Sequence, residues 1–196
     1  VNDAPGAVIT PATYAATEQV ALTLKGTGLS ISDVDAGSGS MTVTLSVGEG
    51  TITATAGDSG AGVSGSGTSS ITITGTVTEI NAVLGGASTS TLSYTNNSDT
   101  PSASTTLTLA VDDNGNTGGG ALTAQDTATI NITAVNDAPD AIDDAVSVLE
   151  NGTVASDVTP GTPGQDGDLE GDTLTVDRID AATFTPGSPI TLSSGA

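Results

Sequence analysis

The sequence contains no cysteine and no histidine, so disulfides cannot brace the fold and the usual ligands of thiol redox and zinc sites are missing. A serine nucleophile would lack its usual histidine base. Paired carboxylates could still cleave glycosides, but the chain offers only three aromatic residues as sugar platforms: Tyr14, Tyr94 and Phe184. We therefore predict that the protein is not an enzyme.

Positive charge is almost absent. Lys25 and Arg178 face 23 acidic residues, which gives a net charge of −21 at pH 7. No basic patch exists to release counterions, so we exclude nucleic acid as a partner. No apolar run approaches the roughly 18 residues of a membrane span, so we predict no membrane insertion. Self-repulsion of this size usually requires bound cations or high ionic strength.

An internal repeat divides the chain. The pentapeptide at residues 1–5 recurs unchanged at residues 135–139, an offset of 134 residues. The proline that ends each copy favours an extended entry into the next segment. We predict a complete module over residues 1–136 and the start of a second, truncated module over residues 137–196. Because the first residues already belong to a repeat, we expect the chain to be part of a longer protein.

Strand periodicity dominates the first module. Apolar and polar residues alternate in segments bounded by Gly, Asn, Asp and Ser, which predicts β-strands. The segments are 41–47, 71–74, 105–111 and 128–133, with weaker ones at 19–24 and 51–55. In the second module we predict strands at 145–149, 173–176 and 189–192. This pattern favours an all-β sandwich. The exception, 78–84, predicts one short helix with Thr78 as N-cap and a glycine stop.

Acidic residues follow the repeat. An Asp-x-Asp lies at 33–35, which is 30 residues after Asp3, and another lies at 166–168, which is 29 residues after Asp137. Loop carboxylates are the hard oxygen ligands that calcium takes six to eight of. The alternative is that these are solvated turn aspartates. Residues 166–177 also match the start of an EF-hand loop, but the proline-rich segment before them argues against a flanking helix.

These motifs resemble the cadherin-like tandem repeats of giant bacterial adhesins. The segment 135–139 looks like the Asp-x-Asn-Asp-Asn linker of cadherins, and 33–35 resembles their Asp-x-Asp. Residues 111–115 resemble their Ala-x-Asp-x-Gly. Glu18-Gln19 and Glu150-Asn151 resemble their Pro-Glu-Asn, although no proline precedes either glutamate. The resemblance covers essentially the whole chain and implies a Greek-key β-sandwich of cadherin or immunoglobulin type.

Position by position, the resemblance implies two Ca²⁺ sites at the junctions. The upstream site would take groups of a preceding module together with Asn2, Asp3, Asp33, Asp35 and Asp113. The downstream site would use Glu18, Asp99, Asn136, Asp137, Asp166 and Asp168.

The function that the resemblance implies is mechanical. We expect an extracellular repeat of a secreted or surface-anchored bacterial adhesin, which calcium stiffens into a spacer for cell adhesion or biofilm formation. Its partners would be neighbouring repeats of the same chain. The alternative is a calcium-dependent carbohydrate-binding module. Cell-surface polysaccharide and a homophilic partner both remain open as further ligands.

Overall fold

The computed structural model describes residues 1–116, 118–142, 166–174, 178–179 and 182–183. It divides into two compact units, Val1–Val135 and Asn136–Ala196. This boundary lies one residue from the predicted one.

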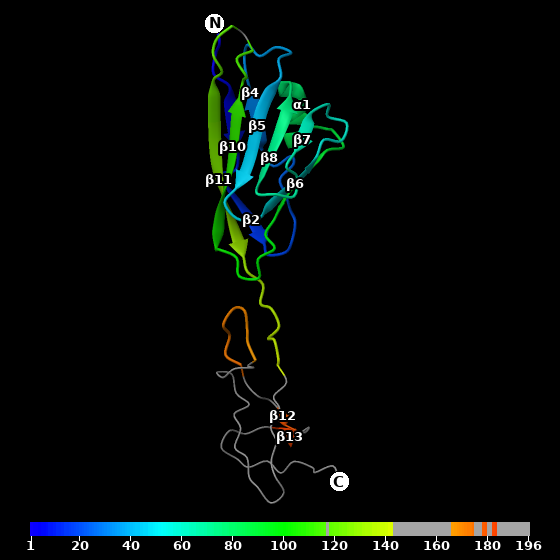
Figure 1. Ribbon diagram of the computed structural model, residues 1–196, viewed down its shortest axis with the longest axis vertical. Coiled ribbons are helices and arrows are strands. Elements are labelled where there is room, and N and C mark those ends of the chain that lie inside the picture. Colours follow the sequence, from blue (N-terminus) through cyan, green and yellow to red (C-terminus); the bar gives the residue numbers. More distant parts are fainter. Residues whose placement is uncertain (117, 143–165, 175–177, 180–181, 184–196) are drawn as a thin grey trace, which may run out of the picture. The chain divides into compact units, whose positions relative to one another are not determined.

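A six-stranded sheet forms the larger layer of the first unit (Figure 1). In spatial order its strands are β2 (Thr13–Thr17), β11 (Thr123–Thr133), β10 (Ser104–Asp112), β5 (Met41–Val47), β8 (Ser70–Gly75) and β7 (Gly62–Ser64). Neighbours are antiparallel except for β2, which runs parallel to β11. Strand β2 lies near the beginning of the unit's sequence and β11 lies at its end, so their pairing holds the two ends of this sequence together.

Smaller sheets complete the described architecture. One has the order β3 (Leu22–Thr23), β9 (Thr91–Thr95) and β6 (Thr51–Thr55), and another pairs β1 (Gly6–Ile9) with β4 (Leu29–Ser32). In the second unit β12 (Arg178–Ile179) pairs with β13 (Ala182–Thr183). The described residues are thus mostly strands in mixed sheets with one helix, which agrees with the predicted all-β sandwich.

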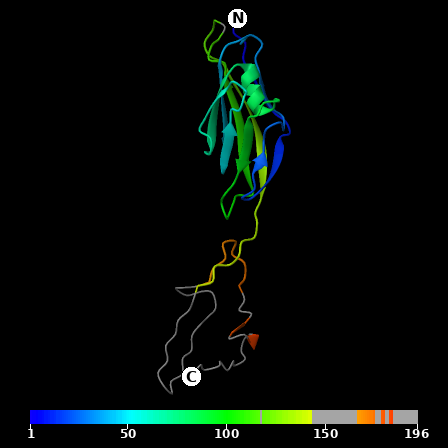
Figure 2. The same cartoon turned by 90° about the vertical axis from the view of Figure 1, so that its right-hand side faces the viewer.

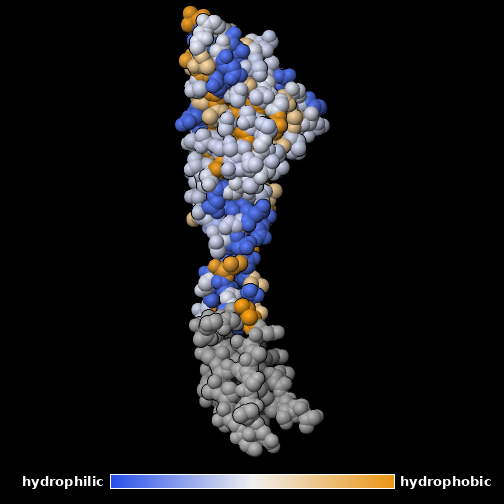
Figure 3. All heavy atoms as spheres, viewed as in Figure 1, coloured by the Kyte–Doolittle hydropathy of each residue, from blue (hydrophilic) through white to orange (hydrophobic). Residues whose placement is uncertain are grey.

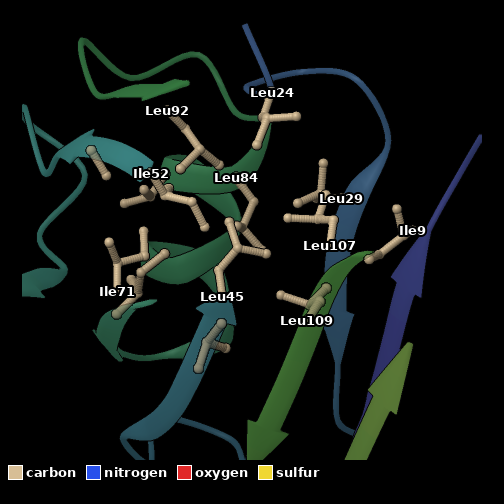
Figure 4. Packing of buried hydrophobic residues seen from close by; sticks show 14 of the residues in the cluster. Ile9, Leu24, Leu29, Leu45, Ile52, Ile71, Leu84, Leu92, Leu107 and Leu109 are labelled. Atoms are coloured by element: carbon tan, nitrogen blue, oxygen red, sulfur yellow. The ribbon is translucent and has the colours of Figure 1, made fainter. Parts of the chain in front are cut away.

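Apolar and polar residues alternate strictly in the strands that form the core. In β5 the side chains of Met41, Val43 and Leu45 are fully buried, while the threonines between them are only partly covered. Figure 4 shows Leu45 and Leu109 from the large sheet together with Leu84 of α1 (Val77–Leu84) in one apolar cluster. Because the core is almost entirely aliphatic, its stability depends on many side chains of moderate size.

The helix begins two residues earlier than predicted. Its N-cap is Thr76 rather than Thr78, because the Thr76 hydroxyl accepts the Glu79 N–H and the Glu79 carboxylate accepts the Thr76 N–H. This reciprocal capping box satisfies two N–H groups that the first turn would leave without partners. The helix ends at Leu84 with Gly85 as its C-cap, as the predicted glycine stop requires.

Some strand predictions succeed and others do not. The bounds of 41–47 and 51–55 are confirmed. The prediction of 19–24 is wrong, since only Leu22–Thr23 is a strand and Gln19 adopts a left-handed φ of 58°. The predicted strands 145–149 and 189–192 lie outside the described residues. Of 173–176, residues 173 and 174 are described and are not in a strand.

Hydrophilic residues are spread unevenly over the face of the first unit that Figure 3 shows. Its N-terminus lies at one end of its long direction, and the chain leaves β11 at the other (Figures 1 and 2). On the face in Figure 3, strongly hydrophilic residues gather mainly toward these ends, whereas the middle is paler. On this face, hydrophilic residues are therefore concentrated where the chain enters and leaves the unit.

We predict that Leu45→Ala lowers the free energy of unfolding of the first unit by about 2–5 kcal/mol, because it opens a cavity at a fully buried position. Urea unfolding followed by circular dichroism would measure the loss. Val20→Ala is the control, since Val20 is 56% exposed and its truncation should change stability by about 0.5 kcal/mol or less. A loss below about 1 kcal/mol for Leu45→Ala would contradict the assigned core.

Candidate metal centre

Glu18 is a buried carboxylate at the end of the first unit from which the chain leaves. It directly follows β2, its N–H donates to the Thr133 carbonyl at 3.0 Å, and its Oε2 accepts the Val135 N–H at 2.9 Å. The side chain is only 1% exposed, and its Oε1 has no hydrogen-bond partner in the described part of the chain. Burying a carboxylate with an unmatched oxygen is unfavourable, and a bound cation would compensate the cost.

The neighbouring loop brings a second carboxylate to Glu18. The Gln19 N–H donates to the Asn96 carbonyl at 2.7 Å, and Gln19 Nε2 donates to Asp99 Oδ1 at 2.8 Å. These two bonds hold Gln19 in its left-handed conformation, which costs a non-glycine residue of order 1 kcal/mol or more. Carboxylate oxygens of Glu18 and Asp99 then lie within 4.8 Å of each other.

Asp137 supplies a third acid. It follows Val135 by two residues, so their Cα atoms are at most about 7 Å apart, and the Val135 N–H is bonded to Glu18. Glu18, Asp99 and Asp137 form an acidic group that could hold a metal ion, although the geometry does not identify the metal. Of the three, only Glu18 is buried; Asp99 is exposed and Asp137 is intermediate.

The residues of the predicted upstream site gather at the opposite end of the first unit. Asn2 Nδ2 donates to Asp113 Oδ2 at 2.7 Å, and the Asp3 N–H donates to Asp35 Oδ2 at 3.1 Å. Asp33 Oδ1 accepts the N–H of Asp35 at 2.9 Å. Within the described ranges, however, no three acidic residues at this end approach one another as Glu18, Asp99 and Asp137 do.

Asp113 has a structural role at this end. It is 1% exposed, and its Oδ1 accepts the N–H groups of Gly115 and Leu122, both at 2.8 Å. The hydrogen bonds from Leu122 and Gly115 lower the pKa of Asp113, while the charge of Asp35 opposes the shift. Asp113 therefore carries a negative charge at neutral pH and closes the turn after β10, as the Asn114-Gly115 sequence also favours.

The downstream residues of the second unit divide into two groups. The Asp137 N–H donates to Glu170 Oε2 at 3.4 Å, and Asp168 Oδ1 accepts the Glu170 N–H at 3.1 Å. Asp166 instead accepts the Ile142 N–H at 2.8 Å. The sequence did not predict Glu170 as a site residue, because the Asp-x-Asp motif points to Asp166 and Asp168.

Asn136 and Glu150 are the remaining residues of the sequence motifs. The Asn136 side chain is exposed, and its Nδ2 donates to the Asp137 carbonyl at 3.3 Å. This bond orders the entry to Asp137. Glu150 lies outside the described residues.

A shallow groove on the large sheet is the other candidate binding feature. Residues of β5, β10 and β11 line it: Thr42, Thr44, Ala110, Val111, Asp112, Thr123, Ala124 and Gln125. The lining offers hydroxyl and amide groups. It contains no aromatic residue on which a sugar ring could stack.

Comparison of the sequence with protein-family models and with curated proteins found no match. In the described residues no helix is long and apolar enough to cross a membrane. The chemistry of the acidic group is therefore the basis for assigning a function.

Glu49 positions the loop that carries Asp99, since it accepts hydrogen bonds from Asn96 Nδ2 at 2.7 Å and from the Ser102 N–H at 3.2 Å. Bonds from Ser102 and then Asn96 lower the pKa of Glu49. The folded state thus binds this proton less tightly than the unfolded state. The stabilisation is fully present above the unfolded pKa and disappears as pH falls through the folded one.

We predict that Glu49→Gln destabilises the first unit at pH 7 and that its difference from the unmodified chain shrinks as the pH falls below about 4, where the carboxylate of the unmodified chain becomes protonated. Urea unfolding of both proteins across this range would measure the difference. Two stability curves that stay parallel would contradict the assigned role of Glu49.

Proposed function

We propose that the chain is a calcium-binding, cadherin-like repeat of an extracellular bacterial adhesin, in which bound calcium stiffens the connection between successive Greek-key sandwiches. The observation that carries the proposal is Glu18: a buried carboxylate with an unmatched Oε1, beside Asp99 and bonded to the segment that leads to Asp137. The bacterial and adhesive parts rest on the motif resemblance alone.

Ligand chemistry selects the type of ion. All three acids offer oxygen, and the chain has no histidine or cysteine to favour a transition metal. Magnesium requires a small, nearly octahedral set of ligands and retains several waters, whereas calcium accepts irregular sets of six to eight oxygens. Backbone carbonyls and water around Glu18, Asp99 and Asp137 would complete such a set, so we propose calcium.

The mechanism follows from the position of Glu18. In the absence of an ion, the negative charges of Glu18, Asp99 and Asp137 repel one another. A calcium ion shared by these carboxylates would hold the Asn136–Asp137 segment against the end of the first unit and restrict its rotation. Extracellular modules bind calcium at roughly 10⁻⁴–10⁻³ M, so stiffening would occur outside the cell, where calcium is abundant.

A carbohydrate-binding module is the second candidate. The groove over β5, β10 and β11 favours it, because its threonines, Asp112 and Gln125 could hydrogen-bond sugar hydroxyls. The absence of aromatic side chains from the lining weakens this candidate. Binding of the chain on a glycan array, lost on mutation of Gln125 but retained in chelator, would favour the groove over the metal centre.

Calcium at about 5 mM should stabilise the whole chain by about 1–2 kcal/mol relative to chelator, if binding is confined to the folded state. We expect a rise of several degrees in Tm and a smaller effect of magnesium at the same concentration. Differential scanning calorimetry would measure both. An unchanged Tm in calcium would contradict the proposed function.

Glu18→Gln separates a ligand from a merely structural residue. The glutamine oxygen can still accept the Val135 N–H, but the buried charge is removed. We therefore expect the variant to equal or exceed the unmodified chain in Tm in chelator, yet to lose most of its response to calcium. Asp112→Asn, at the end of β10, is the charge-matched control and should keep the full response. A normal calcium response in Glu18→Gln would exclude Glu18 as a ligand.

Stiffening itself can be measured by small-angle X-ray scattering. We expect calcium to narrow the distribution of interatomic distances of the chain and to leave the scattering of the isolated residues 1–135 almost unchanged. Glu18→Gln should remove the effect on the longer chain. Identical curves in calcium and chelator would contradict the mechanical role even if calcium binds.

A further inference from the structure

A tight turn follows β2, and Gln19 adopts a strained conformation in it. The Val20 N–H donates to the Thr17 carbonyl at 3.1 Å, which closes the turn, and Gln19 at its third position has a φ of 58°. Turns with a positive φ at this position favour glycine or asparagine there. Glycine would form the same turn without strain. A strained residue of another type is held in place by its surroundings, and such residues cluster at functional sites.

The side-chain amide of Gln19 is bonded to one acid of the metal centre. Its Nε2 donates to Asp99 Oδ1 at 2.8 Å. Glu18, whose buried Oε1 is unmatched among the described residues, directly precedes Gln19 in the chain. Carboxylate oxygens of Glu18 and Asp99 lie within 4.8 Å of each other, where two negative charges repel. The N–H that Gln19 donates to Asp99 favours the charged form of that carboxylate and offsets part of the repulsion.

The backbone of Gln19 is anchored to the loop that carries Asp99. The Gln19 N–H donates to the Asn96 carbonyl at 2.7 Å. Asn96 is only 2% exposed, and its own Nδ2 donates to Glu49 Oε1 at 2.7 Å. Gln19 therefore holds this loop at two points, with its backbone at Asn96 and with its side chain at Asp99. Together the two bonds fix the carboxylate of Asp99 relative to Glu18.

We infer that Gln19 is the positioning residue of the metal centre: its amide and its left-handed backbone hold Asp99 beside Glu18 before an ion binds. The inference rests on the proposed function, and all three residues belong to the first unit. Gln19 acts through Asp99 and has no need to touch the ion. Ligands that are already in place lose less conformational freedom on binding, so this arrangement raises the affinity for the ion.

Two substitutions separate the side chain of Gln19 from its backbone. Gln19→Gly removes the amide and accepts the positive φ, whereas Gln19→Ala removes the amide and keeps the strain. In chelator we expect the Tm of Gln19→Gly to be close to that of the unmodified chain and several degrees above that of Gln19→Ala. Val20→Ala is the control at the neighbouring position, since Val20 is 56% exposed.

Calcium titration of the full chain by isothermal calorimetry measures the effect of positioning. We expect both Gln19 variants to weaken calcium binding by about tenfold or more, as removal of a metal ligand's hydrogen-bond partner typically does. Val20→Ala should leave the affinity unchanged. Glu18→Gln identifies the heat that belongs to this centre, because it lacks the buried charge. Weaker binding by Gln19→Gly with an undiminished Tm in chelator is a combination that simple destabilisation of the fold would not produce.

The outcomes separate this inference from the function on which it rests. Calcium binding by the unmodified chain with unchanged affinity in Gln19→Gly overturns the role of the amide and leaves the proposed function intact. A loss of affinity in Gln19→Ala alone also overturns it, since backbone strain would then explain the loss. Absence of calcium binding in the unmodified chain overturns the proposed function and the inference together.

Discussion

Negative charge without protein counter-charge is the constraint on which the arrangement of this molecule depends. The chain has 23 acidic residues and two basic ones, and Lys25 is already committed: its Nζ donates to the carbonyls of Ser88 and Ser90. The acids must therefore be stabilised by backbone N–H groups, by water or by cations. Asp113 and Asp168 use backbone N–H groups. Asp33 and Glu18 each bind backbone N–H through one oxygen and leave the second oxygen unmatched among the described residues.

The sandwich makes this distribution of charge tolerable. Strict alternation assigns the apolar residues of β5 and β10 to one face of the sheet and keeps acidic residues out of the apolar core. Acids then concentrate in the turns where strands end. The parallel pairing of β2 with β11 sets Glu18 beside the exit of the chain, because Thr17 is paired with Thr133 immediately before it. Charge at the ends of the unit is thus a consequence of the topology.

Sequence-based prediction located the regular strands correctly. It failed where long-range strand pairing or local hydrogen bonds determine whether an element forms and where it begins. Alternation located 41–47 and 51–55 correctly, because every second side chain there is buried. It did not reveal β2, whose alanines and threonines carry little apolar signal and whose partner lies more than 100 residues away. Thr78 was mistaken for the N-cap because only hydrogen bonds distinguish it from Thr76. Glu18, Asp99 and Asp137 were predicted from the motifs, and the structure brings oxygens of all three together.

The two units hold the start of their pentapeptides with turns of similar geometry and different sequence. The backbone fixes the position of the second acid in each turn through the N–H of Asp3 or Asp137, and either an aspartate or a longer glutamate can reach that N–H. The feature common to both units is therefore a carboxylate that accepts the N–H of the pentapeptide aspartate, and not a particular residue type. A junction built in this way couples two events physically. The carboxylate oxygens that repel one another without a cation are the ligands that a cation would bring together. Ordering of the segment after Val135 and occupancy of the site should therefore be coupled, so that each increases with the other.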